Sequence, residues 1–294
     1  MTAPTPGPTP PAVRVVCVTF NPGPELDDFA TSLRAGSSAE VELVLVDNGT
    51  EHERVDRVVQ EHGAVLVRDG HNHGYGGAAN RGSTGARQRW IVVANPDVVW
   101  HPGALDLLLE AGERHPEAGA LGPTLLNTDG TRYPSSRAFP SLVQGVGHAL
   151  LGKVWPGNPF TVRYRQDHQE PRGDEGPTGW LSGACLLLRR EAFEQVEGFD
   201  EAYFMFFEDL DLAERLLAAG WSSIHVPAAV TTHVGGTSWR ARPEAMIRAH
   251  HRSAALYLSR RYPAWYQAPV RLVLRVGLLA RQTVELRAAH RELR

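Results

Sequence analysis

The sequence predicts an α/β fold: a Rossmann-like mixed, mainly parallel sheet flanked by helices, followed by a C-terminal helical extension. Short β-branched runs alternate with helical segments through the first half of the chain, which is typical of a parallel sheet covered by helices. Polar residues and glycines gather where these runs end, and the chain beyond Pro243 has a mainly helical pattern. We expect a disordered lead over residues 1–12, an α/β domain over 13–240 and a helical extension over 241–294.

Five strands and four helices are expected in the first half. The strands are short apolar runs, Val13–Phe20, Val41–Val46, Ala64–Arg68, Trp90–Ala94 and Ala118–Gly122. The helices lie between them, at Pro24–Ala35, Glu51–His62, Ala78–Arg89 and Pro102–Arg114. Open α/β sheets bind ligands at the carboxyl ends of their strands, so nucleotide binding is the default expectation there.

The second half is less regular. A segment rich in proline, glycine and aromatic residues, Thr124–Glu175, predicts a long and partly ordered excursion of the kind that is more often functional than idle. After it we expect strands at Gly179–Leu188 and Ser223–Val226, with the helix Glu208–Ala219 between them.

Composition excludes several classes of protein. With 294 residues, 42% hydrophobic and 21% charged, the chain is neither fibrous nor disordered as a whole, and its net charge of −3 gives no reason to expect a nucleic-acid partner. Cys17 and Cys185 lie in apolar runs and predict buried, reduced thiols in a cytoplasmic protein. The lead lacks the features of a signal peptide, and no apolar stretch is long enough to span a bilayer, so membrane contact is expected only at the surface.

Asn95-Pro96-Asp97 follows the fourth expected strand. Asn95 and Asp97 are separated by one residue and would point the same way into the ligand crevice. A carboxylate there suits Mg²⁺ or Mn²⁺, which take oxygen ligands from one or two carboxylates and from substrate phosphates. Asn-Pro-Asp also makes a good turn without any ligand, and the motif alone leaves the two interpretations evenly balanced.

Asp47-Asn48 ends the second expected strand in the same manner. Asp47 can hydrogen-bond a nucleobase or ribose, as an acidic residue at this place does in dinucleotide sites. It can equally cap the following helix, and the two roles are compatible.

The glycine-rich run from Asn72 to Asn80 resembles a phosphate-binding loop. It lacks the Lys-Ser/Thr pair of a Walker A site, and its glycine spacing does not fit G-x-G-x-x-G. Small residues here let a helix pack closely on the sheet or let a ligand approach the backbone, so the run is a weak signal alone.

Three carboxylates, Glu208, Asp209 and Asp211, begin a helix directly after an aromatic cluster. Acidic residues are favoured in a first helical turn by the helix dipole, which is a sufficient structural explanation. Beside the phenylalanines at 204, 206 and 207, however, a carboxylate would lie in a poorly hydrated pocket that raises its basicity for proton abstraction.

His233 follows a short apolar run and precedes Gly235 and Gly236. A lone histidine is more often structural than catalytic or metal-binding. The glycines leave room for a phosphate or a sugar to approach.

In their order and spacing these segments resemble glycosyltransferase family 2, whose members have the GT-A fold, over about Val13 to Leu258. Within it they are similar to bacterial rhamnosyltransferases that act on polyprenyl-diphosphate-linked GlcNAc in actinobacterial cell-wall synthesis. The matching motifs are Val18-Thr19-Phe20-Asn21, Val46-Asp47-Asn48, the run 72–80, Asn95-Pro96-Asp97, Trp180-Leu181-Ser182-Gly183-Ala184, Gly198-Phe199-Asp200-Glu201, Phe207-Glu208-Asp209-Leu210-Asp211 and His233-x-Gly235-Gly236-x-Ser238.

The resemblance implies a nucleotide-sugar donor site within a GT-A catalytic domain over 13–240. The residues it assigns to the nucleotide and the donor are Thr19, Asn21, Asp47, Asn48, Gly74, Tyr75, Asn80 and Asn95. Asp97 would bind the Mg²⁺ or Mn²⁺ that bridges the donor phosphates. Because Asn95 occupies the first acidic position of the Asp-x-Asp motif, His233 becomes a candidate further ligand.

The resemblance also implies an inverting reaction. Asp209, next to Glu208, would remove the proton of an acceptor hydroxyl, which attacks the anomeric carbon in line with the leaving diphosphate. Trp180, Ser182 and Gly183 would border the acceptor, although Trp180 suits an ordinary core equally well. The expected donor is dTDP-β-L-rhamnose and the expected acceptor is GlcNAc-diphospho-polyprenol. The alternatives are another nucleotide sugar, such as a UDP-sugar, and a non-catalytic nucleotide-sugar-binding protein.

The C-terminal segment from Trp265 onward interleaves apolar residues with arginines. Such a basic amphipathic helix can lie in a membrane interface, on the inner face of the cell membrane. It can also cover the catalytic domain or form a homodimer contact. Apolar residues of the excursion between Phe139 and Trp155 offer another surface for a lipid.

Overall fold

The computed structural model describes residues 12–140, 174–235 and 243–292. Its strands are β1 (Val13–Thr19), β2 (Val41–Asp47), β3 (Val65–Val67), β4 (Trp90–Ala94), β5 (Val98–Trp100), β6 (Ala118–Leu126), β7 (Arg132–Tyr133), β8 (Ser136–Arg137), β9 (Gly176–Thr178), β10 (Trp180–Leu181), β11 (Cys185–Arg189) and β12 (Ser222–His233). The main sheet has the order β3-β2-β1-β4-β11-β6-β12-β5. Along it, β11 and β5 run opposite to the other strands, so the expected mixed, mainly parallel sheet is confirmed.

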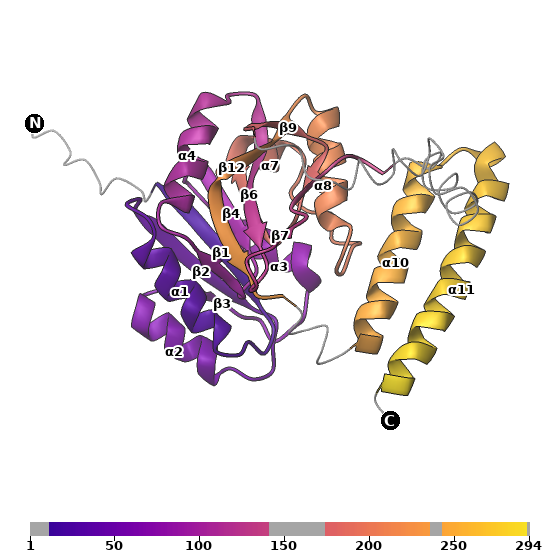
Figure 1. Ribbon diagram of the computed structural model, residues 1–294, viewed down its shortest axis with the longest axis horizontal. Helices are drawn as coiled ribbons and strands as arrows, with labels where there is room; N and C mark the ends of the chain where they lie inside the picture. Colours follow the sequence, from indigo (N-terminus) through magenta and orange to yellow (C-terminus); the bar gives the residue numbers. More distant parts are fainter. Residues whose placement is uncertain (1–11, 141–173, 236–242, 293–294) are drawn as a thin grey trace, which may run out of the picture.

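Helices cover both faces of this sheet (Figure 1). They are α1 (Glu25–Ala35), α2 (Glu53–His62), α3 (Gly74–Ser83), α4 (Ala104–Arg114), α7 (Arg190–Gln195), α8 (Glu208–Ala218), α10 (Pro243–Arg261), the 3-10 turn η1 (Trp265–Gln267) and α11 (Ala268–Glu292). β1 shows why there are two cores: Val15 and Cys17 pack with α1, α2 and α4, whereas Val16 and Val18 pack with α3, α7 and α8. Cys17 and Cys185 are buried free thiols, as expected.

The glycine-rich run forms a helix earlier than the sequence predicted. α3 begins at Gly74 rather than at Ala78, because Asn48 holds the Gly74 carbonyl at 2.9 Å and the left-handed φ of +71° at Gly74 turns the chain into the helix. It also ends at Ser83 rather than at Arg89, ahead of Gly85, which again has a φ of +71°.

Two strand predictions in the second half were wrong in extent. The expected strand Gly179–Leu188 is divided, because the backbone N–H of Ser182 donates to Ser135 and takes β10 out of the main sheet to pair with β8. The strand predicted at Ser223–Val226 is the first part of the much longer β12, which passes a bulge and continues to His233. The short strand β5, directly after Asp97, was not predicted.

The helices expected beyond Pro243 form a hairpin beside α8 (Figure 1). α10 faces the body of the protein: the Tyr257 hydroxyl donates to Glu214 of α8 at 2.7 Å, and Arg260 pairs with Asp200. α11 packs on the other side of α10. Among the described residues, no helix combines the length and the apolar character needed to cross a bilayer. The lead up to residue 11 and the apolar residues at 142–155 lie outside the described residues.

Candidate active site

The segments that carry Asp97 and Asp209 meet at one end of the sheet. β4 and β11 are antiparallel neighbours, so the end of β4 lies beside the start of β11. There, Asn95 donates its backbone N–H to the Ala184 carbonyl at 2.9 Å. One residue earlier, the backbone N–H of Gly183 donates to Oδ2 of Asp209 at 2.9 Å. Two carboxylates that are distant in the sequence are thereby brought to one region.

Glu208 and Asp209 are adjacent carboxyl groups at the start of α8, the first buried and the second half-buried. Burial raises the pKa of both, and the charge of Asp209 raises the pKa of Glu208 further. The N–H groups of Gly183 and Leu210 donate to Asp209 at 2.9 and 2.8 Å and counteract this rise in its pKa. Oε2 of Glu208 has no hydrogen-bond partner among the described residues. The surroundings therefore favour a protonated Glu208 beside an ionised Asp209, which suits Asp209 as a base.

Gly183 connects Asp209 to the glycine-rich run. While its N–H binds Asp209, its carbonyl accepts the hydroxyl of Tyr75 from α3 at 2.5 Å. Tyr75 is itself buried, and its pKa is raised by burial, so it stays a neutral donor. The structure thus places Tyr75, predicted to line the donor site, where it positions the peptide that holds Asp209.

Asp97 belongs to a second polar cluster with Asn95 and His233. Nε2 of His233 lies 3.2 Å from Oδ1 of Asp97 and 3.2 Å from Nδ2 of Asn95. The backbone N–H of Gly235 donates to Oδ2 at 3.0 Å, whereas Oδ1 is buried without a hydrogen bond among the described residues. This unsatisfied oxygen beside an imidazole nitrogen fits a divalent cation. Since no group of three or more Asp, Glu, His or Cys side chains gathers for a metal in the described ranges, donor phosphates and water would complete the ligand set.

The Asp47 carboxylate is the centre of a hydrogen-bond cluster at the ends of β1 and β2. It accepts bonds from Thr19 at 3.3 Å, from the N–H of Gly49 at 2.9 Å, and from His52 and Arg68 at 2.8 Å each. Thr19 is fully buried, so its hydrogen bond supports Asp47 from the interior of the protein. Sequence reasoning missed His52 and Arg68. The position of Arg68 at the end of the third expected strand was the available signal, because ligand-binding residues gather at such ends.

Asn21 and Asn48 hold the loops that follow the same strands. Asn21 has a positive φ of 47° and accepts the backbone N–H of Thr50 at 2.7 Å. Asn48 donates to the Gly74 carbonyl at 2.9 Å and accepts the N–H of His73 at 3.3 Å. Because β1, β2 and β4 are parallel neighbours, these loops lie at the same end of the sheet as Asp97, where the three strands have their carboxyl ends.

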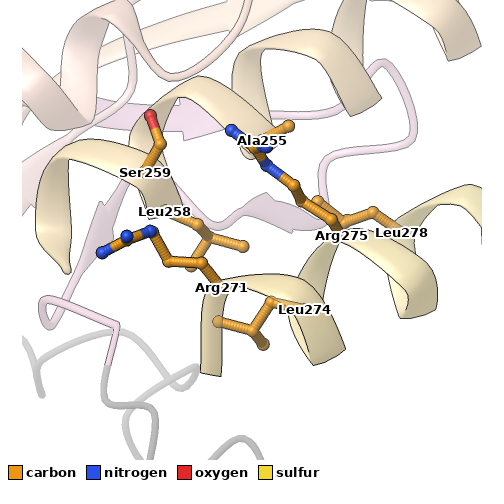
Figure 2. A pocket seen from close by; sticks show the side chains of 7 residues that line it. All are labelled: Ala255, Leu258, Ser259, Arg271, Leu274, Arg275 and Leu278. Carbon is orange, nitrogen blue, oxygen red and sulfur yellow. The ribbon is translucent and has the colours of Figure 1, made fainter. Parts of the chain in front are cut away.

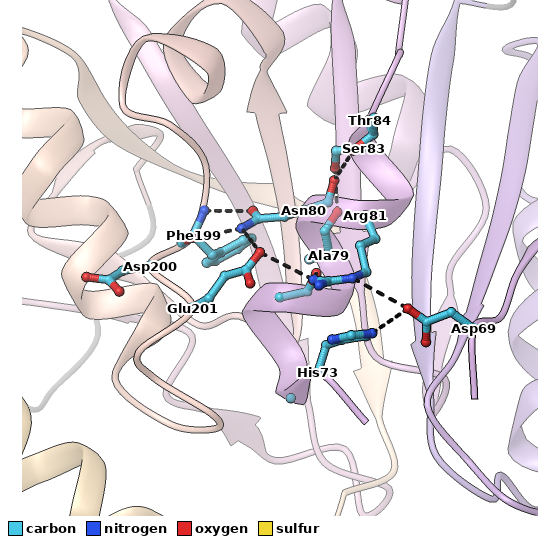
Figure 3. A network of polar contacts seen from close by, with 12 residues as sticks. Asp69, His73, Ala79, Asn80, Arg81, Ser83, Thr84, Phe199, Asp200 and Glu201 are labelled. Carbon is cyan, nitrogen blue, oxygen red and sulfur yellow. Dashed lines mark hydrogen bonds and ion pairs between the residues drawn. The ribbon is translucent and has the colours of Figure 1, made fainter. Parts of the chain in front are cut away.

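Asn80 ties α3 to the loop that leads toward α8 (Figure 3). Its side-chain amide donates to the Phe199 carbonyl and accepts the Phe199 N–H, both at 2.8 Å. Arg81 supports the same loop through Glu201 at 3.3 Å. In this structure Asn80 therefore positions a loop, and its predicted contact with the donor stays a prediction.

The predicted acceptor residues lie around β10. The half-buried Trp180 donates from Nε1 to the Ala138 carbonyl at 3.2 Å, and the Arg137 guanidinium stacks 5.1 Å from its ring centre. Ser182 accepts the N–H of Ala184 at 3.4 Å. The positive charge of Arg137 also lowers the pKa of Asp209. No pattern singled out Arg137, because it lies in the irregular excursion after β6.

The turn before Glu208 has an unusual backbone. Phe206 and Phe207 both have a φ of 68°, in the left-handed region that bulky residues rarely adopt. α10 supports this turn: the Ser253 hydroxyl donates to the Met205 carbonyl at 2.7 Å, and the His250 ring lies 5.4 and 5.5 Å from the Phe206 and Phe207 rings. Glu208 and Asp209 therefore follow a strained turn that a C-terminal helix supports.

One relative matches nearly the whole chain, and a second matches less than half of it. It is 45% identical over 292 residues to the N-acetylglucosaminyl-diphospho-decaprenol L-rhamnosyltransferase of Mycobacterium tuberculosis, which covers 95% of this chain and 94% of that protein. It is 31% identical over 127 residues to the rhamnosyltransferase WbbL of Escherichia coli K12, covering 43% and 45% of the two chains.

Solved structures agree on the fold. The mannosyltransferase PcManGT of Pyrobaculum calidifontis, solved with GDP-Man and Mn²⁺, superposes with a TM-score of 0.58 at 18% identity, covering 96% of this chain and 76% of that one. GalNAc-T7, solved with UDP, GalNAc and Mn²⁺, gives a TM-score of 0.57 at 14% identity over 76% and 43%. The model of the glycosyltransferase like family 2 matches residues 10–254. The chain has the GT-A fold and belongs to glycosyltransferase family 2.

Proposed function

We propose that the protein transfers L-rhamnose from dTDP-β-L-rhamnose to a GlcNAc-diphospho-polyprenol, with inversion at the anomeric carbon, in cell-wall linker synthesis. The observation that carries the proposal is the 45% identity, over almost the full length of both chains, to an enzyme named for this acceptor and this sugar. The arrangement of the Glu208–Asp209 pair supports a base-catalysed displacement, because one of the two carboxyls is held ready to accept a proton.

The donor would lie across the carboxyl ends of β1, β2 and β4. The nucleoside would bind beside Asp47 and its hydrogen-bond partners. The diphosphate would bind beside Asp97 and His233. A divalent cation bound by Asp97 and His233 would neutralise charge on the departing diphosphate. Nδ2 of Asn95 lies 3.2 Å from the same nitrogen, Nε2 of His233, and would release it to the cation.

The acceptor hydroxyl would approach Asp209 from the side of β10. Asp209 takes the proton of this hydroxyl as its oxygen attacks the anomeric carbon, and a single displacement gives the inverted product. Gly183 keeps Oδ2 of Asp209 in place, and Tyr75 keeps Gly183 in place. Trp180 offers an aromatic face on which a sugar ring can stack.

Product formation tests this proposal. The full chain is incubated with Mg²⁺ or Mn²⁺, a GlcNAc-diphospho-polyprenol and either dTDP-rhamnose or a panel of UDP- and GDP-sugars, and products are identified by mass spectrometry. We expect a deoxyhexose added to the lipid only with dTDP-rhamnose, and loss of product with EDTA. Transfer from a UDP-sugar alone would show that the protein uses a different donor. Hydrolysis of dTDP-rhamnose without transfer would show that this lipid is not its acceptor.

Binding of dTDP tests the metal site separately. Asp97→Ala should weaken dTDP binding by at least about tenfold in the presence of Mn²⁺, because it removes the carboxylate of the proposed ligand set. In EDTA the variant and the wild type should bind equally. Calorimetric titration distinguishes these outcomes, and equal binding with Mn²⁺ would remove Asp97 from the site.

A further inference from the structure

α11 has two unlike sides. The residues that face α10 are buried or half-buried at helical spacing, at positions 271, 274, 278, 282, 285 and 289. Around the seam between the two helices, Leu258 of α10 and Leu274 and Leu278 of α11 line a shallow hollow (Figure 2). The opposite side of α11 exposes large apolar side chains, each between 42% and 71% accessible: Val270, Leu272, Val273, Val276, Leu279 and Val284.

The tip of the hairpin carries two exposed aromatic side chains directly before α11. Trp265 and Tyr266 in η1 are 85% and 67% accessible. The backbone that leads into η1 is held by α11, because Arg271 donates to the carbonyls of Tyr262 and Ala264. Tryptophan and tyrosine, each with an apolar body and a polar tip, are the residues enriched where protein meets lipid headgroups.

Charge separates the hairpin from the rest of the chain. Residues 243–294 contain ten of the thirty basic residues and three of the thirty-three acidic ones, so their formal charge is +7 while the preceding residues carry −10. At 3.6 residues per turn, Arg275 and Arg281 flank the apolar face of α11 on its two sides, and Arg287 follows it beyond Val284. The apolar surface is therefore bordered by cations.

We propose that the outer face of α11, together with Trp265 and Tyr266, is a docking surface for an anionic phospholipid bilayer. The apolar side chains enter the boundary between headgroups and acyl chains, and the flanking arginines pair with lipid phosphates. This inference goes beyond the proposed sugar transfer and does not depend on the donor or the acceptor.

Charge complementarity favours a bilayer over a second copy of the chain. Two hairpins packed face to face would bring two segments of charge +7 together and would offer Arg275 and Arg287 no excess of acidic partners. An anionic lipid surface satisfies the apolar face and the arginines at once. α10 then connects this surface to the turn before Glu208, since the same helix holds Met205 through Ser253.

Vesicle co-sedimentation of the full chain tests the proposal. We expect binding to phosphatidylcholine vesicles that contain about one third phosphatidylglycerol, weaker binding at high salt, and little binding to phosphatidylcholine alone. Leu272→Asp combined with Val276→Asp should lower the partition coefficient at least about tenfold, because two charges would enter the apolar boundary. Arg275→Gln and Arg287→Gln should lower it about fivefold each.

Leu217→Asp is the matched control, because Leu217 is 58% exposed on α8, outside the hairpin. It should bind vesicles as the wild type does, and circular dichroism and thermal melting confirm that each variant is folded. Equal partition of the wild type and the α11 variants would overturn the proposal. So would a dimer, by light scattering, that Leu272→Asp with Val276→Asp separates into monomers without changing the partition.

Discussion

Glu208 and Asp209 are neighbours in the chain, but the protein surrounds their charges differently. Two backbone N–H groups donate to Asp209, whereas Oε2 of Glu208 is buried without a hydrogen bond among the described residues. In a pair of nearby carboxyls the better solvated one carries the charge and the other keeps the proton. The division of roles follows from these contacts and not from the residue types.

Isosteric amides separate the two roles. Asp209→Asn should lower kcat by at least about 10², because the base is lost, while leaving dTDP binding unchanged. Glu208→Gln should stay within about tenfold of the wild type, since a neutral amide replaces a carboxyl that is already protonated. Initial rates and dTDP titrations measure both. The opposite order of effects would make Glu208 the base.

The rate should depend on pH through Asp209. Its pKa lies above the ordinary value of 3.8 because of burial, and only the ionised form accepts a proton. Activity should therefore fall as the pH decreases through this raised pKa. Arg137→Gln removes a charge that lowers this pKa and should shift the acid limb of kcat/KM to higher pH.

The exposed Arg87 provides the control for that experiment. Arg87→Gln should leave the pH profile of kcat/KM unchanged. An acid limb that stays in place in Arg137→Gln would mean that another group controls it.

At the scale of elements, glycine positions decide where α3 can begin. A Cβ on Gly74 would lie 2.0 Å from the Phe204 carbonyl oxygen, and the backbone there already has a φ of +71°. Gly85 has the same φ, but a Cβ there would meet nothing within 4 Å. A side chain would be unfavourable for the backbone conformation at both positions, but only at Gly74 would it also overlap a neighbouring atom.

Alanine at each position should separate these two costs. Gly85→Ala should destabilise the protein by about 1–2 kcal/mol through its left-handed backbone alone. Gly74→Ala should lower the Tm by about 5 °C more, because the added methyl group would overlap the Phe204 carbonyl. Differential scanning calorimetry measures both variants. Equal melting temperatures would show that the loop at Phe204 moves freely.

Sequence patterns predicted elements well where local signals and packing agree. α1, α4, α8, β1 and β4 occur within two residues of the predicted bounds, because their apolar spacing matches the face they bury. The division of β10 from β11 was missed, since it depends on a bond between residues 182 and 135. At the site, motifs singled out Asp97, Asp209 and His233. Arg68 had only its place at a strand end as a signal and Arg137 had none, because both reach the site through contacts far apart in the sequence.

At the scale of the whole molecule, the C-terminal hairpin lies outside the sheet but reaches the proposed catalytic pair, Glu208 and Asp209, through the turn at residues 205–207. His250→Ala with Ser253→Ala should loosen this turn and lower kcat about tenfold, because a small misplacement of a base is costly. The KM for the donor should change less than about twofold, since Asp47 and Asp97 are held by contacts from Arg68 and from the backbone of Gly235.

His290→Ala is a suitable control, because His290 belongs to α11 and pairs with Glu244 at 3.1 Å, away from the turn. It should leave kcat unchanged. A rise in KM matching the fall in kcat, or an equal effect of His290→Ala, would indicate general destabilisation of the hairpin instead of a specific effect on Asp209.

The place of β11 in the sheet also has a consequence for biosynthesis. β4 and β6 are complete by residue 126, but the strand that joins them spans residues 185–189. Until this strand leaves the ribosome, β4 presents an open edge to other nascent chains. We therefore expect assembly of the sheet to be slow and non-local, and expression yield to depend on how soon that edge is covered.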